Sequence, residues 1–134
     1  MKRYHALLLV ILLLIASALA ARQVWGGKNV VRLGMADNGR GVILEADQTL
    51  EIALDGNITT GYSWELGAAV EPLLRLQGEP EYVVSSELLG AGGVTIFRFA
   101  PDAPGTVTLR LLYRRPWEKD VAPAQTFAVQ VTVR

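Results

Sequence analysis

The recurrence of large apolar residues at every second position, in two segments near the carboxyl end, constrains the fold more than any other feature of this sequence. The alternating apolar residues are Val107, Leu109, Leu111 and Tyr113 in the first segment and Phe127, Val129, Val131 and Val133 in the second. A period of two is produced by a β-strand that buries one face. No segment of the sequence carries the 3.6-residue apolar stripe of an amphipathic helix. The sequence therefore predicts an all-β fold.

Shorter extended runs between turn signals predict further strands, which we place at residues 30–35, 41–45, 48–54, 62–66, 80–84 and 94–100. Asp37-Asn38-Gly39 is typical of a hairpin turn, because Asn and Gly tolerate positive φ, so the first two strands are expected to pair with each other. Trp64 is expected in the core. For the strand at 94–100, the sequence does not decide which face is buried. Short alternating strands separated by turn signals are typical of an immunoglobulin-like antiparallel β-sandwich.

The first 20 residues have the pattern of a secretory signal peptide. Lys2 and Arg3 give a positive start, residues 6–15 are wholly apolar, and Ala18 and Ala20 are the small residues that a signal peptidase needs. The alternative is an uncleaved membrane anchor, against which the short apolar run counts. Either way, we expect the domain to lie outside the cytoplasm, periplasmic or secreted. The predicted regions are a signal peptide at residues 1–20, a flexible lead at 21–29 and a single sandwich domain at 30–134.

Charge and residue content exclude several classes of function. Signal cleavage removes Lys2 and Arg3 from the 13 basic residues, which leaves 11 against 13 acidic ones and a net charge of −2. Nucleic acid binding, which needs clustered Lys and Arg, is then disfavoured. The chain has no cysteine, and its one histidine, His5, would leave with the signal. Catalytic triads and transition-metal sites need these residues. Carboxylate pairs stay possible, but the acidic residues are scattered and none has the spacing of a calcium loop. We therefore predict a binding protein with no catalytic residue, metal or cofactor.

Three loops are expected to lie at one end of the sandwich. In a fold whose successive strands run up and down, every second connection returns to the same end. Counted from the strand at 48–54, the loops that share an end are residues 55–61, 85–93 and 114–124. The connections at 67–79 and 101–105 are expected at the opposite end.

Each of these three loops contains residues that a plain turn does not need. Thr59 and Thr60 lie between two glycines, and we expect a stiff tip whose hydroxyls and backbone amides face outward. The second loop holds Gly90-Ala91-Gly92-Gly93, where missing side chains allow close approach to another surface. The third loop holds Arg115-Pro116-Trp117, and an exposed Trp beside Arg is typical of an interface hot spot.

Plainer interpretations of these loops remain open. The first two also fit a solvated turn and a flexible hairpin tip. Trp117 has the alternative of folding back over the end of the sandwich. Arg114 or Arg115 has the alternative of pairing with Glu118 or Asp120, at little net gain in stability.

Taken together and in this order, the three motifs resemble those of the chagasin family of cysteine-peptidase inhibitors. The motifs are Asn57-Ile58-Thr59-Thr60-Gly61, Gly90-Ala91-Gly92-Gly93 and Arg115-Pro116-Trp117. The resemblance implies an immunoglobulin-like sandwich that inhibits papain-like cysteine peptidases reversibly and without a covalent bond. It implies that Thr59 and Thr60 enter the catalytic cleft and that the glycine-rich motif lies along its non-primed side. The third motif is implied to grip the other flank, with Trp117 stacking on aromatic surface.

One position departs from the family pattern, because Ile58 stands where the family usually has Pro. Loss of that φ restraint is expected to leave the free loop more mobile, at a cost of about 0.4 to 1 kcal/mol. The change also creates Asn57-Ile58-Thr59, a glycosylation acceptor pattern. The expected partner is a papain-like cysteine peptidase, bound by a monomer that has no membrane contact after signal cleavage.

Two other functions fit the same residues. A module that binds carbohydrate or cell-envelope polymer would use Trp117, Tyr62 or Tyr113 as stacking platforms. A structural or adhesion domain would carry these loops incidentally. The first predicts a response of tryptophan fluorescence to sugars, and the second predicts neither that response nor an effect on peptidases.

Overall fold

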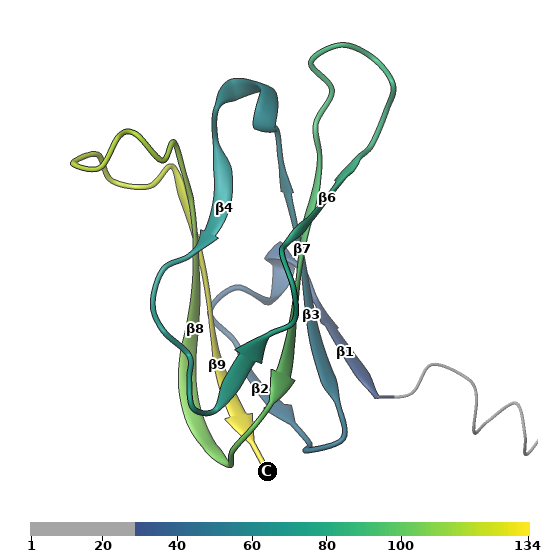
Figure 1. Ribbon diagram of the computed structural model, residues 1–134, viewed down its shortest axis with the longest axis vertical. Helices are drawn as coiled ribbons and strands as arrows, with labels where there is room; N and C mark the ends of the chain where they lie inside the picture. The colour runs from purple at the N-terminus through teal and green to yellow at the C-terminus, as the bar shows by residue number, and fades with distance from the viewer. Residues whose placement is uncertain (1–28) are drawn as a thin grey trace, which may run out of the picture.

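The computed structural model describes residues 29–134, which form two facing β-sheets (Figure 1). The first sheet contains β1 (Val30–Leu33), β3 (Thr49–Gly56), β5 (Leu74–Leu76), β6 (Glu81–Val84) and β7 (Gly93–Pro101). The second contains β2 (Gly41–Leu44), β4 (Ser63–Leu66), β8 (Gly105–Arg114) and β9 (Gln125–Val133). The helical elements of this part of the chain are two 3-10 turns, η1 (Met35–Asp37) and η2 (Ile58–Thr60). The predicted signal peptide and residues 21–28 of the lead lie outside the described residues and stay predictions.

The strand order confirms the immunoglobulin-like β-sandwich. It is β1-β3-β7-β5 in the first sheet, where β6 also pairs with β7, and β2-β9-β8-β4 in the second. Most neighbouring strands are antiparallel, as expected, but β1 runs parallel to β3 and β2 runs parallel to β9. Among residues 29–134, no helix is long and apolar enough to cross a membrane.

The predicted hairpin of residues 30–45 is wrong, because β1 and β2 belong to different sheets. Gly39 does adopt the positive φ, +82°, that the turn signal indicated. However, the turn binds β9 instead of closing a hairpin. Oδ1 of Asn38 accepts from the Ala128 N–H at 2.8 Å, and its Nδ2 donates to the Thr126 carbonyl at 3.3 Å. These bonds hold the crossing segment beside β9, and β2 continues along that strand.

Residues 67–79, predicted as one long connection, contain the short strand β5. Both β5 and β6 run antiparallel to β7 and pair with different parts of it, Leu74 with Pro101 and Glu81 with Ile96. They therefore act as one interrupted strand. The alternation of strand direction, which brings every second connection back to the same end, is preserved.

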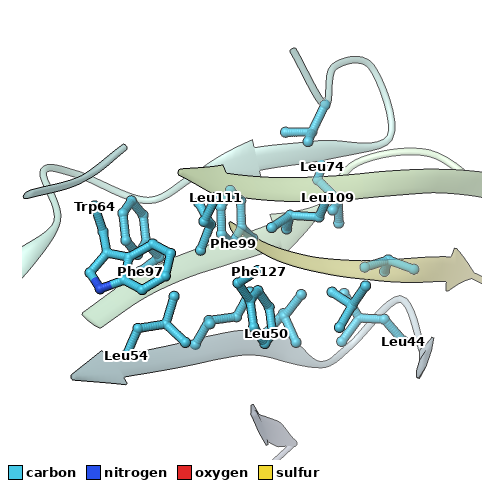
Figure 2. Close-up of a cluster of buried hydrophobic side chains, with 14 of the residues drawn as sticks. Leu44, Leu50, Leu54, Trp64, Leu74, Phe97, Phe99, Leu109, Leu111 and Phe127 are labelled. Carbon is cyan, nitrogen blue, oxygen red and sulfur yellow. The ribbon is translucent and has the colours of Figure 1, made fainter. Parts of the chain in front are cut away.

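The core lies between the sheets and is built from the alternating residues (Figure 2). Trp64 is buried as predicted. The sequence did not decide which face of β7 is buried, and in the structure Phe97 and Phe99 point into the core. The predicted apolar positions of β9 are at most 4% exposed, namely Phe127, Val129, Val131 and Val133.

The outer face of β7 carries charge instead. Arg98 forms ion pairs with Glu51 of β3 at 3.3 Å and with Glu81 of β6 at 3.0 Å. These pairs are partly exposed, so they fix which face of the strand meets water more than they add stability.

Leu109 on β8 has no exposed surface, so Leu109→Ala should leave a cavity in the core. We expect the free energy of unfolding to fall by about 2 to 5 kcal/mol, measured by urea unfolding followed by circular dichroism. The matched control is Leu89→Ala, at a fully exposed leucine, which should change stability by less than about 0.5 kcal/mol. Equal losses in both variants would contradict this placement of the core.

Candidate functional site

The three loops predicted to share one end of the sandwich do share it (Figure 1). We call them the threonine loop (residues 57–62), the glycine loop (residues 85–92) and the tryptophan loop (residues 115–124). The connections predicted at the opposite end also meet, because the Asp102 N–H donates to the Leu73 carbonyl at 2.8 Å. The strand directions of the sandwich therefore bring three segments distant in sequence to one rim.

Hydrogen bonds join the threonine loop to both of its neighbours. Nδ2 of Asn57 donates to the Gly90 carbonyl of the glycine loop at 2.8 Å. Nε of Arg115 in the tryptophan loop donates to the Thr60 carbonyl at 3.1 Å. The three loops therefore form one connected surface with the threonine loop at its centre.

The tip of the threonine loop is a 3-10 turn, not the outward-facing segment expected from two β-branched residues. Oδ1 of Asn57 accepts from the Thr59 N–H at 3.1 Å and from the Thr59 hydroxyl at 2.6 Å. The Thr60 N–H and hydroxyl both donate to the Asn57 carbonyl, at 3.2 and 2.6 Å. Local capping by Asn outweighs the strand preference of Thr here. Thr59 and Thr60 are exposed, but their donors are already satisfied.

An aromatic cluster packs beneath the threonine loop and fixes its position on the sandwich. Tyr113 stacks on Tyr62 with ring centroids 5.3 Å apart and lies 5.1 Å from the ring of Trp64. The Tyr113 hydroxyl accepts from the Asn57 N–H at 2.9 Å, and the Trp64 indole N–H donates to the Asp55 carbonyl at 2.9 Å. The pairing of β4 with β8 places Trp64 opposite Tyr113, so sheet register positions the loop.

The glycine-rich motif divides between a loop and a strand. Gly90 has a φ of +74°, which favours glycine, and lies exposed beside Asn57. Gly93, predicted as part of the exposed loop, is instead the first residue of β7, where it is buried and paired with Gly56. A Cβ at Gly93 would overlap the Val83 carbonyl. Its missing side chain therefore serves close strand packing.

Two exposed leucines next to this motif were missed by the sequence reasoning. Leu88 is 78% exposed, and Leu89 is fully exposed. Thr59, Val84 and residues 85–91 of the glycine loop line an open recess of about 740 Å³. Two adjacent leucines in an otherwise polar loop were the available signal, because a hairpin tip gains nothing from exposing them.

Trp117 is 67% exposed, so the alternative in which it folds back over the sandwich is wrong. One edge of its ring rests on Gly61, where an added Cβ would overlap Cη2 of the indole. Gly61 also has a φ of +84°. Glycine is required here both by the backbone and by the neighbouring ring.

Both arginines that precede Pro116 form ion pairs, and the pair of Arg115 with Glu118 is the one that the alternative interpretation predicted. Arg115 forms an ion pair with Glu118 at 3.1 Å, and Arg114 forms one with Glu65 of β4 at 3.2 Å. The Arg115 guanidinium also lies over the Tyr62 ring, 4.6 Å from its centroid. Arg115 is therefore held within the rim on three sides.

The rim has the chemistry of a binding surface. It presents a turn whose donors are satisfied, two exposed leucines and an exposed tryptophan on a tightly packed base. Among residues 29–134, no group of three or more His, Cys, Asp and Glu side chains is arranged to hold a metal ion. Shape and apolar contact are what this surface offers a partner.

A family model described as chagasin family peptidase inhibitor I42 matches residues 43–131, a span that contains all three loops. The chain belongs to the chagasin family. Its relatives in that family are peptidase inhibitors and not enzymes, as the sequence predicted for this chain.

Individual relatives agree with this membership. Chagasin of Trypanosoma cruzi is 32% identical over 99 residues, which cover 70% of this chain and 89% of that protein. The cysteine protease inhibitor EhICP2 from Entamoeba histolytica has a TM-score of 0.69 at 22% identity, covering 81% of this chain and all of that one. PbICP-C, solved in complex with falcipain-2, has a TM-score of 0.54 at 22% identity and covers 79% and 99% of the two chains. These two likenesses show the fold alone.

Gly61→Ala should displace Trp117 in this chagasin-family protein, because the new Cβ occupies the position of the indole edge. We expect a changed indole N–H signal of Trp117 in a ¹H–¹⁵N NMR spectrum and a loss of about 1 to 2 kcal/mol from left-handed backbone strain.

The matched control is Gly78→Ala. Gly78 has a similar φ, +71°, but an added Cβ there meets open space. It should cost comparable stability and leave the Trp117 signal in place. An unmoved signal in Gly61→Ala would contradict the contact between the two loops.

Proposed function

We propose that this chain is a reversible, non-covalent inhibitor of papain-like cysteine peptidases that blocks the active-site cleft with its three-loop rim. The observation that carries the proposal is the junction of the loops, through Asn57 with Gly90 and Arg115 with Thr60. Membership of the chagasin family supports the class of partner. PbICP-C, which shares the fold, is bound to falcipain-2 in its solved structure.

The conformation of the tip explains how a cleft is blocked without cleavage. Peptidases attack a peptide bond that lies extended beside the nucleophile, since reaction needs a near-attack geometry. Residues 58–60 form a closed 3-10 turn, and the Gly61 N–H donates to the Ile58 carbonyl at 3.0 Å. Opening the turn to present a bond would break these hydrogen bonds. The inserted tip therefore excludes substrate and water while staying intact.

The two flanking loops supply most of the apolar contact. Trp117 on one side and Leu88 and Leu89 on the other are exposed in the free protein, so their burial against a peptidase is favourable by about 25 cal/mol per Å² of apolar surface. Because hydrogen bonds already hold the loops together, little conformational freedom is lost on binding.

We also propose that the inhibitor acts as a monomer outside the cytoplasm. The chain enters the fold at the end opposite the rim, because β1 runs parallel to β3, whose carboxyl end leads into the threonine loop. The carboxyl terminus lies at that same far end (Figure 1). A signal peptide or anchor on the amino side would leave the rim unobstructed.

The carbohydrate-binding alternative has less support from the contacts. Tyr62 and Tyr113 stack on each other, Arg115 covers the Tyr62 ring, and the Tyr113 hydroxyl binds Asn57. Two of the three expected stacking platforms are therefore occupied. Trp117 alone remains as a free aromatic face.

Titration of papain with the purified full-length chain tests the proposal, and we expect stoichiometric inhibition that is reversed by dilution. Trp117→Ala should raise the inhibition constant about tenfold or more, as at a hot spot. Thr60→Glu should raise it further, because a larger charged side chain at the tip is desolvated in the cleft.

Ile43→Ala is the matched control, at a half-exposed apolar residue whose partner Thr132 lies at the far end of β9. It should inhibit as the unsubstituted chain does. Unchanged potency in both rim variants would remove the three-loop mechanism even if inhibition persisted.

Ile58→Pro should strengthen inhibition severalfold. Ile58 is the first residue of the 3-10 turn and follows Asn57, whose extended φ of −140° suits a residue before proline. Proline removes freedom from the unfolded and mobile states of the loop, worth about 0.4 to 1 kcal/mol. Ile58→Ala, which changes the side chain without restraining φ, is the control. A higher inhibition constant for Ile58→Pro than for Ile58→Ala would contradict this geometry.

A further inference from the structure

We propose that Arg115 is a positioning residue, which holds the Thr59–Thr60 tip in place relative to Trp117, instead of a residue that grips the peptidase. This inference rests on the proposed function. It differs from the role that the family resemblance implied for Arg115. Three contacts of its guanidinium, each to a different part of the rim, carry it.

The first contact completes the turn of the threonine loop. The last carbonyls of a helical turn have no partner within the turn. Nε of Arg115 donates to the Thr60 carbonyl at 3.1 Å, at the point where the turn ends and the chain leaves through Gly61. A charge-assisted hydrogen bond is stronger than a neutral one, so this bond holds the tip from the side of the tryptophan loop.

The second contact places the guanidinium on the aromatic cluster. Its Cζ lies 4.6 Å from the Tyr62 centroid, within the range of a cation–π interaction. Tyr62 stacks in turn on Tyr113, whose hydroxyl accepts from the Asn57 N–H. Arg115 and Tyr113 therefore hold the two ends of the same turn, Thr60 and Asn57.

The third contact is an ion pair within the tryptophan loop. Nη1 of Arg115 donates to Oε1 of Glu118 at 3.1 Å. The carboxylate orients the guanidinium and neutralises it within the tryptophan loop. Nε on Thr60, Nη1 on Glu118 and one face on Tyr62 are therefore all engaged within the protein itself.

The planar shape of the side chain is what this role requires. Lysine keeps the positive charge but lacks the fixed fork of donors and the flat face that stacks on a ring. Arg115→Lys therefore separates charge from geometry. A residue that met the peptidase only as a charge would tolerate this change.

The test begins with the free protein. In full-length Arg115→Lys, we expect the Gly61 amide, which donates within the turn, to exchange its hydrogen about tenfold faster by NMR, because the turn opens more often. The inhibition constant against papain should rise about tenfold as well. Circular dichroism should show an unchanged unfolding transition, since the core is untouched.

Rescue by a second substitution separates positioning from direct contact. Ile58→Pro restrains the same turn from its other end. If Arg115 acts by holding the turn, Ile58→Pro should improve inhibition more in the Arg115→Lys background than in the unsubstituted chain. If Arg115 contacts the peptidase, the two effects should simply add.

Arg75→Lys is the matched control. Nε of Arg75 also donates to a fixed acceptor, Asp102, at 3.2 Å, but Asp102 lies in the turn at the far end. It should leave both exchange and inhibition unchanged. The proposal is overturned if Arg115→Lys weakens inhibition while Gly61 exchange stays unchanged and the effects add. If the unsubstituted chain fails to inhibit papain, the proposed function falls, and the exchange rates still decide whether Arg115 holds the turn.

Discussion

The rim depends on the hydrogen bonds of one residue, Asn57. Its N–H donates to the Tyr113 hydroxyl, its side-chain oxygen caps the turn at Thr59, its carbonyl receives both donors of Thr60, and its Nδ2 reaches Gly90. All of its polar groups are therefore engaged. Because the half-buried Asn57 joins the turn, the aromatic base and the glycine loop, its contacts convert a flexible connection into a tip of defined shape.

The two sheets fix the base of the rim, so the three loops lose little further conformational entropy when they are held together. Trp64 and Tyr113 come from paired strands of the second sheet, and Gly56 and Gly93 from paired strands of the first. The base of the rim is thus fixed by core packing and strand register before any partner arrives. An interface whose loops are ordered in advance loses less freedom on binding, which suits an inhibitor that must fit a preformed cleft.

The placement of the three loops at one end was predictable from the sequence, whereas several details of their contacts were not. Gly90, Trp117 and the common end of the three loops follow from turn chemistry and from the alternation of strand direction. The hydrogen bonds of the threonine hydroxyls, the burial of Gly93 and the contacts of Arg115 with Thr60 and Tyr62 do not. Each depends either on a contact with a residue far away in the sequence or on local hydrogen bonds to Asn57, and residue type alone does not reveal which partner is within reach.

By itself, the sequence determined that the protein is an all-β sandwich with three unusual loops, because the period of two and the turn residues act locally along the chain. It also carried the motifs that indicated the chagasin family. Only the tertiary structure decided which edges pair, with β1 on β3 and β2 on β9 in place of a hairpin. It also decided which rim residues are exposed and which contact one another, because those contacts join side chains that lie far apart in the sequence.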